Sequence, residues 1–252
     1  MTRASFSWRG TAACVTAAGA LVACGGSSVP PAASHSAPSS TAVRPLESCV
    51  PPGAHAHEVT FSTGREQLVG AEFGSGSVGV VMSHEFMSDL CGWVPYATHI
   101  AARGYRALAF DFGFNLTADI AAAAHKLRND GATTIVLMGA SMGATSALSV
   151  AATASPPVAG VASLSGPQEY GGIDAMAAAR QLRMPVVFMA AQLDQPYAQD
   201  AQTMYAACPS VRKQLAIYPG NDHGTQLLRY SVADQAQARL DSFLTSLSPA
   251  GS

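Results

Sequence analysis

The chain has 252 residues, of which 48% are hydrophobic and only 12% are charged. This length and apolar content suffice for one sizeable core, and a single domain is the simplest arrangement. The net charge is −2 and Lys and Arg are scattered, which excludes the basic surface that a nucleic-acid-binding protein needs. We therefore expect no nucleic-acid partner.

The first residues have the pattern of an export signal. Two arginines lead into the weakly apolar run Gly10–Ala23, which is too short to span a membrane. The letters LVACG at 21–25 resemble a bacterial lipobox, in which cleavage before the cysteine leaves that cysteine diacylated. Residues 1–23 would then be the signal peptide, and Cys24 would hold the protein on the outer face of the cell membrane. The alternative is an ordinary signal peptide that contains a cysteine.

Residues 24–48 are rich in Ser, Pro and Ala and lack apolar periodicity, which indicates a flexible tether. We expect the folded domain to occupy residues 49–248. No internal repeat interrupts this region.

Three cysteines fall in the expected domain, Cys49, Cys91 and Cys208. Export favours disulfides, and three cysteines allow one pair. We favour Cys49–Cys91 because Cys208 lies at the end of an expected helix, although the sequence itself leaves the pairing open. None of the cysteines has zinc-ligand spacing. We interpret His55 and His57 as exposed loop residues, since no acidic or cysteine residue accompanies them.

The predicted elements begin with a hairpin over 59–62 and 67–73, whose strands are parted by Thr63-Gly64. The apolar run 78–83 suits a strand buried on both faces. Helices and strands then alternate. In chain order we expect a helix over 93–103, a strand over 105–110, a helix over 116–128, a strand over 133–138, a helix over 142–152, a strand over 158–164, a helix over 173–182, a strand over 185–190, a helix over 197–207, a strand over 214–218 and a helix over 225–247. This alternation predicts a mostly parallel sheet with helices on both faces.

A Gly-x-Ser-x-Gly pattern runs from Gly139 to Gly143 around Ser141, directly between an expected strand and an expected helix. A serine hydroxyl is a poor nucleophile unless it is exposed, close to a base and beside oxyanion donors. A sharp strand-to-helix turn lifts the serine above the sheet and directs the first helical N–H groups at the reacting oxygen. The flanking glycines let helix and strand approach closely. The pattern therefore predicts a nucleophile at the carboxyl ends of the strands, where open sheets bind ligands.

Over about Val59–Leu247 the chain resembles an α/β-hydrolase. That family orders its triad as nucleophile, acid and histidine, with the acid after a late strand and the histidine after the last strand. The resemblance implies that Asp194 is the acid and that His223 is the base. Glu169, which follows the preceding strand, and Asp222, which adjoins the histidine, are the alternative acids.

The resemblance also implies an oxyanion hole. Its first N–H donor follows the nucleophile, here Met142, and its second lies in the loop after the third strand, here Phe86 in the run SHEFM. Glu85 stands where many members have glycine. Dienelactone hydrolases have a related Gln-Glu-apolar pattern in this loop, but their nucleophile is cysteine, so the likeness implies their shape and not their substrate. We interpret His84 as a brace of this loop.

Few residues separate the strand at 158–164 from the strand at 185–190. We therefore expect an α/β-hydrolase fold without the substantial cap domain that many lipases and epoxide hydrolases insert here, and a site open to solvent. Apolar residues near the strand ends are candidates for a substrate pocket, although each could instead pack in the core. They are Phe86, Met87, Phe112, Phe114 and Tyr197.

Together these features predict a monomeric serine hydrolase that cleaves carboxylic esters or similar acyl groups of a small-molecule substrate through an acyl-enzyme. No metal or organic cofactor is implied. The same triad could act on amide, thioester or polyester bonds, and the sequence does not separate these leaving groups. The alternative from another class is a surface binding module that kept the fold and lost activity.

Overall fold

The computed structural model describes residues 48–248. The predicted signal peptide, Cys24 and nearly all of the predicted tether lie outside the described residues. Among the helices of residues 48–248, none has both the length and the apolar character that crossing a membrane requires.

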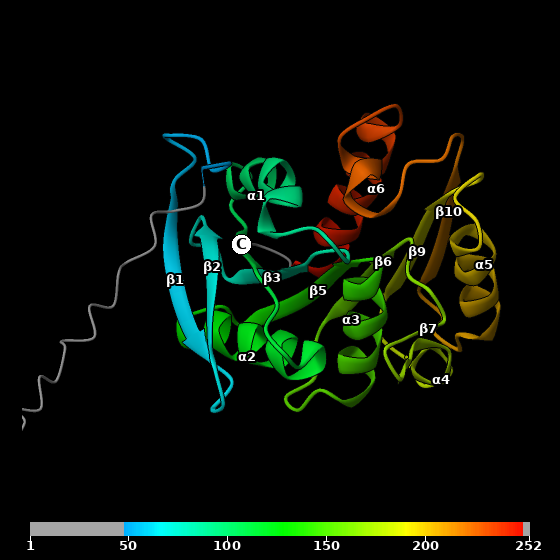
Figure 1. The fold of residues 1–252 in the computed structure, drawn as a ribbon, viewed down its shortest axis with the longest axis horizontal. Coiled ribbons are helices and arrows are strands. Elements are labelled where there is room, and N and C mark those ends of the chain that lie inside the picture. Colours follow the sequence, from blue (N-terminus) through cyan, green and yellow to red (C-terminus); the bar gives the residue numbers. More distant parts are fainter. Residues whose placement is uncertain (1–47, 249–252) are drawn as a thin grey trace, which may run out of the picture. The chain divides into compact units, whose positions relative to one another are not determined.

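An eight-stranded sheet forms the centre of the fold, in the order β1-β2-β4-β3-β5-β6-β9-β10 (Figure 1). β1 and β4 each pair antiparallel with β2, and every other pair in the sheet is parallel. The expected mostly parallel sheet is confirmed, and each strand of this sheet lies within three residues of its predicted bounds. The strands are Ala56–Ser62 (β1), Gln67–Phe73 (β2), Val78–Ser83 (β3), Arg106–Phe110 (β4), Thr134–Ala140 (β5), Gly160–Leu164 (β6), Val186–Ala191 (β9) and Lys213–Tyr218 (β10).

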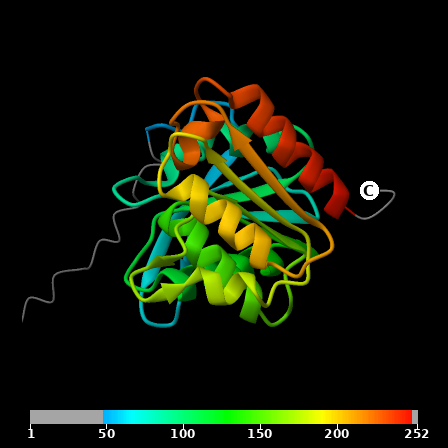
Figure 2. The ribbon, with the colours of Figure 1, turned by 90° about the vertical axis from the view of Figure 1, so that its right-hand side faces the viewer.

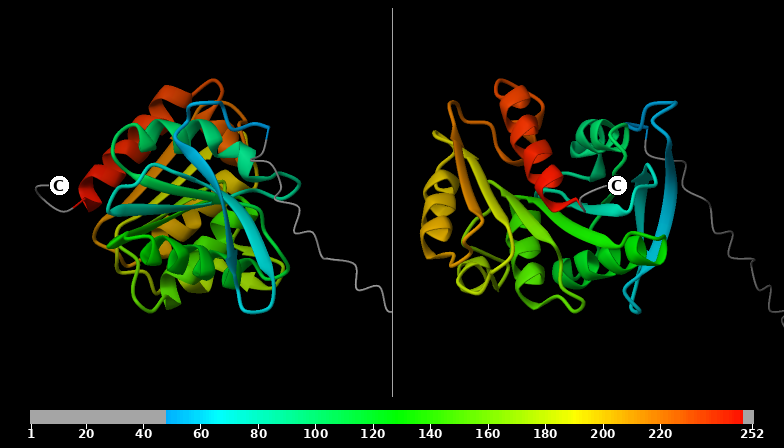
Figure 3. Two further views of the ribbon diagram at one scale, coloured as in Figure 1. Left: turned by 90° about the vertical axis from the view of Figure 1, so that its left-hand side faces the viewer. Right: turned by 180° about the vertical axis from the view of Figure 1, so that it is seen from behind.

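Helices cover both faces of the sheet, as Figure 2 and Figure 3 show from further directions. Because side chains alternate along a strand, Val80 and Met82 of β3 belong to one apolar core and Val81 between them belongs to the other. This explains why β3 is apolar throughout. The first face carries α1 (Val94–Ala101) and α6 (Ala233–Leu247), and the second carries α2 (Leu116–Asn129), α3 (Met142–Thr153), α4 (Ala175–Ala179) and α5 (Tyr197–Ala207).

The helix expected over 173–182 is wrong in extent. A two-stranded hairpin of β7 (Glu169–Tyr170) and β8 (Ile173–Asp174) precedes a helix of five residues, α4. Gly171 and Gly172 form the tip of this hairpin, both with positive φ. Asp174 ends the hairpin and begins the helix, because its carboxylate accepts a hydrogen bond from Ala177 N at 2.7 Å. Within residues 48–248, this short segment is all that separates β6 from α4, and no cap domain stands there.

The helix expected over 225–247 is also wrong, since the structure divides it. A 3₁₀ helix, Gly224–Leu228, comes first, and α6 begins at Ala233. The intervening residues 229–231 are exposed, whereas Leu227, Leu228 and Val232 on either side are buried. The break therefore lets two apolar segments reach the core in different directions.

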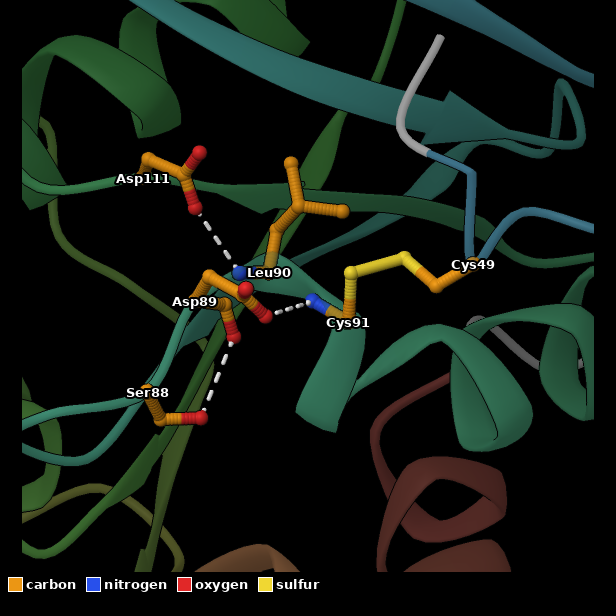
Figure 4. Close-up of a disulfide and its surroundings, with 6 residues drawn as sticks. All are labelled: Cys49, Ser88, Asp89, Leu90, Cys91 and Asp111. Atoms are coloured by element: carbon orange, nitrogen blue, oxygen red, sulfur yellow. Dashed lines mark hydrogen bonds between the residues drawn. A yellow bond between two sulfur atoms is a disulfide. The ribbon is translucent and has the colours of Figure 1, made fainter.

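A disulfide joins Cys49 to Cys91, as favoured from the sequence (Figure 4). Cys208 is a buried free thiol. The bond ties the segment before β1 to the 3₁₀ helix Leu90–Gly92, which follows β3. Asp89 Oδ1 accepts from Cys91 N at 2.9 Å, and Asp111 Oδ1 accepts from Leu90 N at 2.8 Å. The loop after β3 is thus fixed at its far end by one covalent bond and two carboxylates.

Candidate active site

Ser141 lies at the turn between β5 and α3 and has an unusual backbone. Its φ of 49° and ψ of −115° lie in a region that residues other than glycine rarely occupy. This conformation reverses the chain at once from strand to helix, and Ser141 keeps 7% of its surface exposed. The turn has the geometry that the Gly-x-Ser-x-Gly pattern predicts.

The two glycines of the pattern are required by packing. A Cβ atom on Gly139 would lie 2.3 Å from the carbonyl oxygen of Gly143, and one on Gly143 would lie 2.4 Å from the carbonyl oxygen of Ser83. Real Cβ atoms do not approach so closely, so any larger residue would push α3 away from β5 or β3. The glycines therefore hold the helix start against the sheet beneath Ser141.

Asp194 and His223 lie in contact, although 29 residues separate them in the chain. Asp194 follows β9 and is buried, and His223 follows β10. His223 Nδ1 lies 2.9 Å and 3.1 Å from the two carboxylate oxygens of Asp194. Since a carboxylate only accepts hydrogen bonds, Nδ1 carries the proton and Nε2 of a neutral ring remains a proton acceptor.

The loop that carries His223 reaches the strand that carries Ser141. A Cβ on Gly224 would lie 3.3 Å from Ala140 Cβ, and Gly224 N donates to Ser165 Oγ at 3.1 Å. Within residues 48–248, no hydrogen bond joins the Ser141 hydroxyl to the His223 ring. Such bonds are often long in free enzymes and shorten only with substrate bound.

The alternative acids lie elsewhere. Asp222 accepts a hydrogen bond from Ser231 Oγ at 2.8 Å, and Glu169 is an exposed residue of the β7–β8 hairpin, paired across it with Asp174. Among the described residues, Asp194 is the carboxylate in contact with His223.

The two expected oxyanion donors are backbone N–H groups near the turn. Met142 is the first residue of α3, and Phe86 lies in the loop after β3. Within residues 48–248 neither N–H has an acceptor, so both remain available to an external oxygen. The positive end of the α3 dipole adds to the attraction for a negative oxygen at Met142.

His84 holds the loop after β3 against the loop after β4. Its Nε2 accepts from Phe112 N at 3.3 Å, so its Nδ1 is the protonated nitrogen and donates to Glu85 O at 2.7 Å. The ring also meets the Phe112 ring edge to face, with centroids 5.0 Å apart. These contacts agree with its interpretation as a brace.

Two further contacts around the site were not predicted. Glu85 Oε1 accepts from Thr225 Oγ1 at 2.6 Å, while its other oxygen is buried without a partner in the described residues. Ser165, which follows β6, accepts from Gly224 N. Both contacts tie the His223 loop to a neighbouring loop. Glu85 and Ser165 could have been identified from the sequence, because they lie just after β3 and β6.

No group of three or more His, Cys, Asp or Glu side chains in residues 48–248 has the arrangement of a metal site. His55 and His57, the histidine pair considered above, are both exposed, but the interpretation of His57 as a loop residue is wrong, because it lies in β1.

Residues 105–246, which make up more than half of the chain, match the profile of the dienelactone hydrolase family. The chain belongs to the dienelactone hydrolase family. Membership places it among hydrolases and is consistent with an ester hydrolase. No curated protein matches the sequence significantly.

Solved structures show that this family member has the α/β-hydrolase fold. An esterase from Pyrococcus furiosus superposes with a TM-score of 0.67 at 15% identity, covering 76% of this chain and 92% of that one. The esterase domain of a Rhodothermus marinus protein gives 0.65 at 20% identity, covering 76% and 98%. A dienelactone hydrolase from Anabaena variabilis gives 0.61 at 17% identity, covering 76% and 98%.

The apolar candidates for a substrate pocket in this dienelactone hydrolase family member fall into two groups by their exposure. Tyr197 packs on His223, with ring centroids 4.4 Å apart, and Phe112 packs on His84. Phe86, Met87 and Phe114 are exposed by 63%, 91% and 98%. The side chains of these three residues project into solvent, as a site open to solvent allows, and their contact with substrate stays a prediction.

Three successive N–H groups of the loop after β4 donate to ionisable side chains. The bonds are Phe112 N to His84 Nε2 at 3.3 Å, Gly113 N to Asp119 Oδ2 at 3.0 Å and Phe114 N to Glu66 Oε1 at 3.0 Å. Asp119 is fully buried, and its Oδ1 has no partner in the described residues. Burial, with a smaller contribution from the charge of Glu66, raises the pKa of Asp119 to about 6, while the N–H donor of Gly113 opposes the rise.

We expect Asp119→Asn to stabilise the protein at pH 8. Because the pKa of Asp119 is higher in the folded state, its protonated carboxyl stabilises the fold. This stabilisation is fully present below the unfolded-state pKa near 3.8 and is lost as pH rises through the folded-state pKa of about 6. The amide oxygen of asparagine can accept from Gly113 N without a buried charge, so the gain in unfolding free energy at pH 8 is on the order of 1–3 kcal/mol. Urea denaturation at pH 4 and pH 8 measures it. An equal loss of stability at both pH values would contradict this account.

Proposed function

We propose that the chain is a serine hydrolase that cleaves carboxylic esters through an acyl-enzyme on Ser141. The observation that carries the proposal is the buried Asp194 carboxylate against His223 Nδ1, in a loop that contacts the strained turn of Ser141. A serine hydroxyl on such a turn, an oriented imidazole and a buried carboxylate are the parts that nucleophilic acyl transfer requires.

In the proposed reaction, Ser141 Oγ attacks the ester carbonyl carbon while His223 Nε2 takes the hydroxyl proton. Asp194 keeps the proton on Nδ1 and stabilises the imidazolium that forms. The N–H groups of Met142 and Phe86 donate to the oxyanion. The imidazolium then protonates the departing alcohol, and water, deprotonated by the same ring, hydrolyses the acyl-enzyme.

The experiment uses a fluorophosphonate probe and p-nitrophenyl esters of increasing acyl length. The purified protein should be labelled covalently and should hydrolyse the esters, because the probe mimics the tetrahedral intermediate and traps an activated serine oxygen. Ser141→Ala should lose both the label and the turnover. A wild-type protein that takes no label and cleaves no ester would instead favour a non-catalytic binding module. Thioester, amide and polyester substrates in the same screen decide among the leaving groups.

We further propose that the protein is exported and anchored through a diacylated Cys24, on the strength of the lipobox-like run at 21–25. Two acyl chains give stable membrane binding where one gives only marginal binding, since each buried CH₂ contributes about 0.8 kcal/mol. Cys24→Ala should move the protein from the membrane fraction to the soluble fraction or leave it as an unprocessed precursor. If Cys24→Ala fractionates with membranes as the native protein does, the anchor proposal is refuted.

A further inference from the structure

Exposed large apolar side chains concentrate at one edge of the sheet. Phe86, Met87, Phe114, Leu193 and Tyr230 all come after the carboxyl ends of parallel strands, namely β3, β4, β9 and β10, whereas Val211, which is 96% exposed, precedes β10 at the opposite end. Single exposed apolar residues are ordinary, but a gathering of them marks an interaction surface. We call the first five side chains the apolar rim.

The apolar rim surrounds the strand that carries Ser141. In the sheet β5 lies between β3 and β6, so the loops after β3 and β6 flank the serine on either side. Phe86 from the first loop and Tyr170 from the β7–β8 hairpin after β6 come together, with ring centroids 6.4 Å apart. This pair brings apolar surface from the loops after β3 and β6 together on the two sides of β5.

Ser141 lines none of four hollows found in residues 48–248. The largest of these, about 710 Å³, lies beside His55 and His57, between the start of β1 and the end of α1. Around the serine, the apolar rim adds exposed apolar surface to the half-buried Phe112 and Tyr197.

The charges beside the apolar rim do not suit an anionic partner. Asp89 and Glu169 are exposed in the loops after β3 and β6, and Glu66 accepts from Phe114 N. The cations beside these residues are Arg229, next to Tyr230, and the exposed Arg65, next to Glu66. These mixed charges include no cluster of cations of the kind that binds anionic lipid headgroups, which favours an uncharged apolar partner.

We propose that the apolar rim seats the surface of a water-insoluble, uncharged ester, such as an acylglycerol droplet, with Ser141 facing that surface. The inference rests on the proposed function and names its substrate class. No cap has to open over the site, so binding and access to Ser141 occur in one step. Burying one Phe or Met side chain strengthens binding by about tenfold or more.

The test measures adsorption to a triolein emulsion, separately from catalysis. All variants are the full chain with Ser141→Ala, to prevent hydrolysis, and Cys24→Ala, to remove any diacyl anchor. Met87→Gln with Phe114→Gln should weaken adsorption by about 100-fold. Val211→Gln, an equally exposed residue at the opposite end of β10, should leave adsorption within about twofold of the parent. Equal adsorption of the rim variant and the Val211 variant would overturn the proposal, as would stronger binding to phosphatidylglycerol vesicles than to triolein.

Hydrolysis by chains that keep Ser141 separates this inference from the proposed function. Met87→Gln with Phe114→Gln should lower the rate on triolein by at least about tenfold more than the rate on p-nitrophenyl acetate. A chain that adsorbs through the apolar rim but cleaves neither ester would refute the proposed function alone. If the chain cleaves p-nitrophenyl acetate and the rim substitutions leave its adsorption unchanged, the proposed role of the apolar rim is refuted and the proposed function is not.

Discussion

Asp194→Asn is expected to lower the turnover number on p-nitrophenyl esters by roughly 10⁴, by analogy with other triads. The asparagine NH₂ would donate to His223 Nδ1, which moves the ring proton to Nε2 and removes the acceptor that Ser141 needs. KM should change little, because the buried carboxylate contacts the imidazole and its substitution leaves the exposed surface of the site unchanged. Turnover is measured per active site, with protein concentration corrected for the folded fraction.

Glu169→Gln and Asp222→Asn are the matched controls, since each removes one carboxylate near the same edge of the sheet. Both should retain turnover within a few-fold, because Glu169 is exposed in its hairpin and Asp222 is bonded to Ser231. If Glu169→Gln proves the crippling change while Asp194→Asn is active, Asp194 is the wrong acid.

The double substitution Cys49→Ser with Cys91→Ser is expected to lower the free energy of unfolding by about 4 kcal/mol. The bond closes a loop whose ends are 42 residues apart, and the chain-entropy model assigns a loop of that length a stabilisation of about 4 kcal/mol. Urea denaturation of the wild type with and without reductant, and of the double variant, measures the effect.

Reductant should lower the stability of the wild type to that of the double variant and leave the double variant unchanged. Cys208→Ala serves as the control, because this thiol is free and its loss should not alter the response to reductant. A reduced wild type as stable as the oxidised one would show that the bond contributes nothing. Ester hydrolysis should fall with reduction as well, since the bond fixes the end of the loop that carries Phe86.

The sheet and the positions of Ser141, Asp194 and His223 were predictable for the same physical reason. Strands buried on both faces are continuous apolar runs, so β3, β5 and β9 stand out in the sequence. Once those strands are located, the polar residues just past their carboxyl ends are brought to one edge by topology alone. Topology brings Asp194 and His223 to the same edge, and the resemblance to α/β-hydrolases is what implied that these two would pair.

Side-chain environments were predicted less well, because they depend on how separate segments meet. Asp119 occupies the first turn of a helix, where acids are common and usually solvated, yet the loop after β4 closes over it completely. Met87 and Phe114 were candidates for a substrate pocket because they are apolar and lie near strand ends, but the exposure of a loop side chain depends on its backbone. Met87, for example, has a φ of 58°. Similarly, an unbroken helical pattern over 225–247 gave no sign of the break before α6.

The backbone conformation at Ser141 lowers the stability of the fold, whereas the proposed chemistry needs a serine at this position. A non-glycine residue held at such a φ and ψ costs on the order of 1–3 kcal/mol, which glycine at the same point would largely avoid. Selection acting on stability alone would therefore favour glycine at this turn. A lineage that lost its substrate would be expected to lose this serine early, so the side chain at position 141 is an indicator of whether a related chain is still under selection for chemistry.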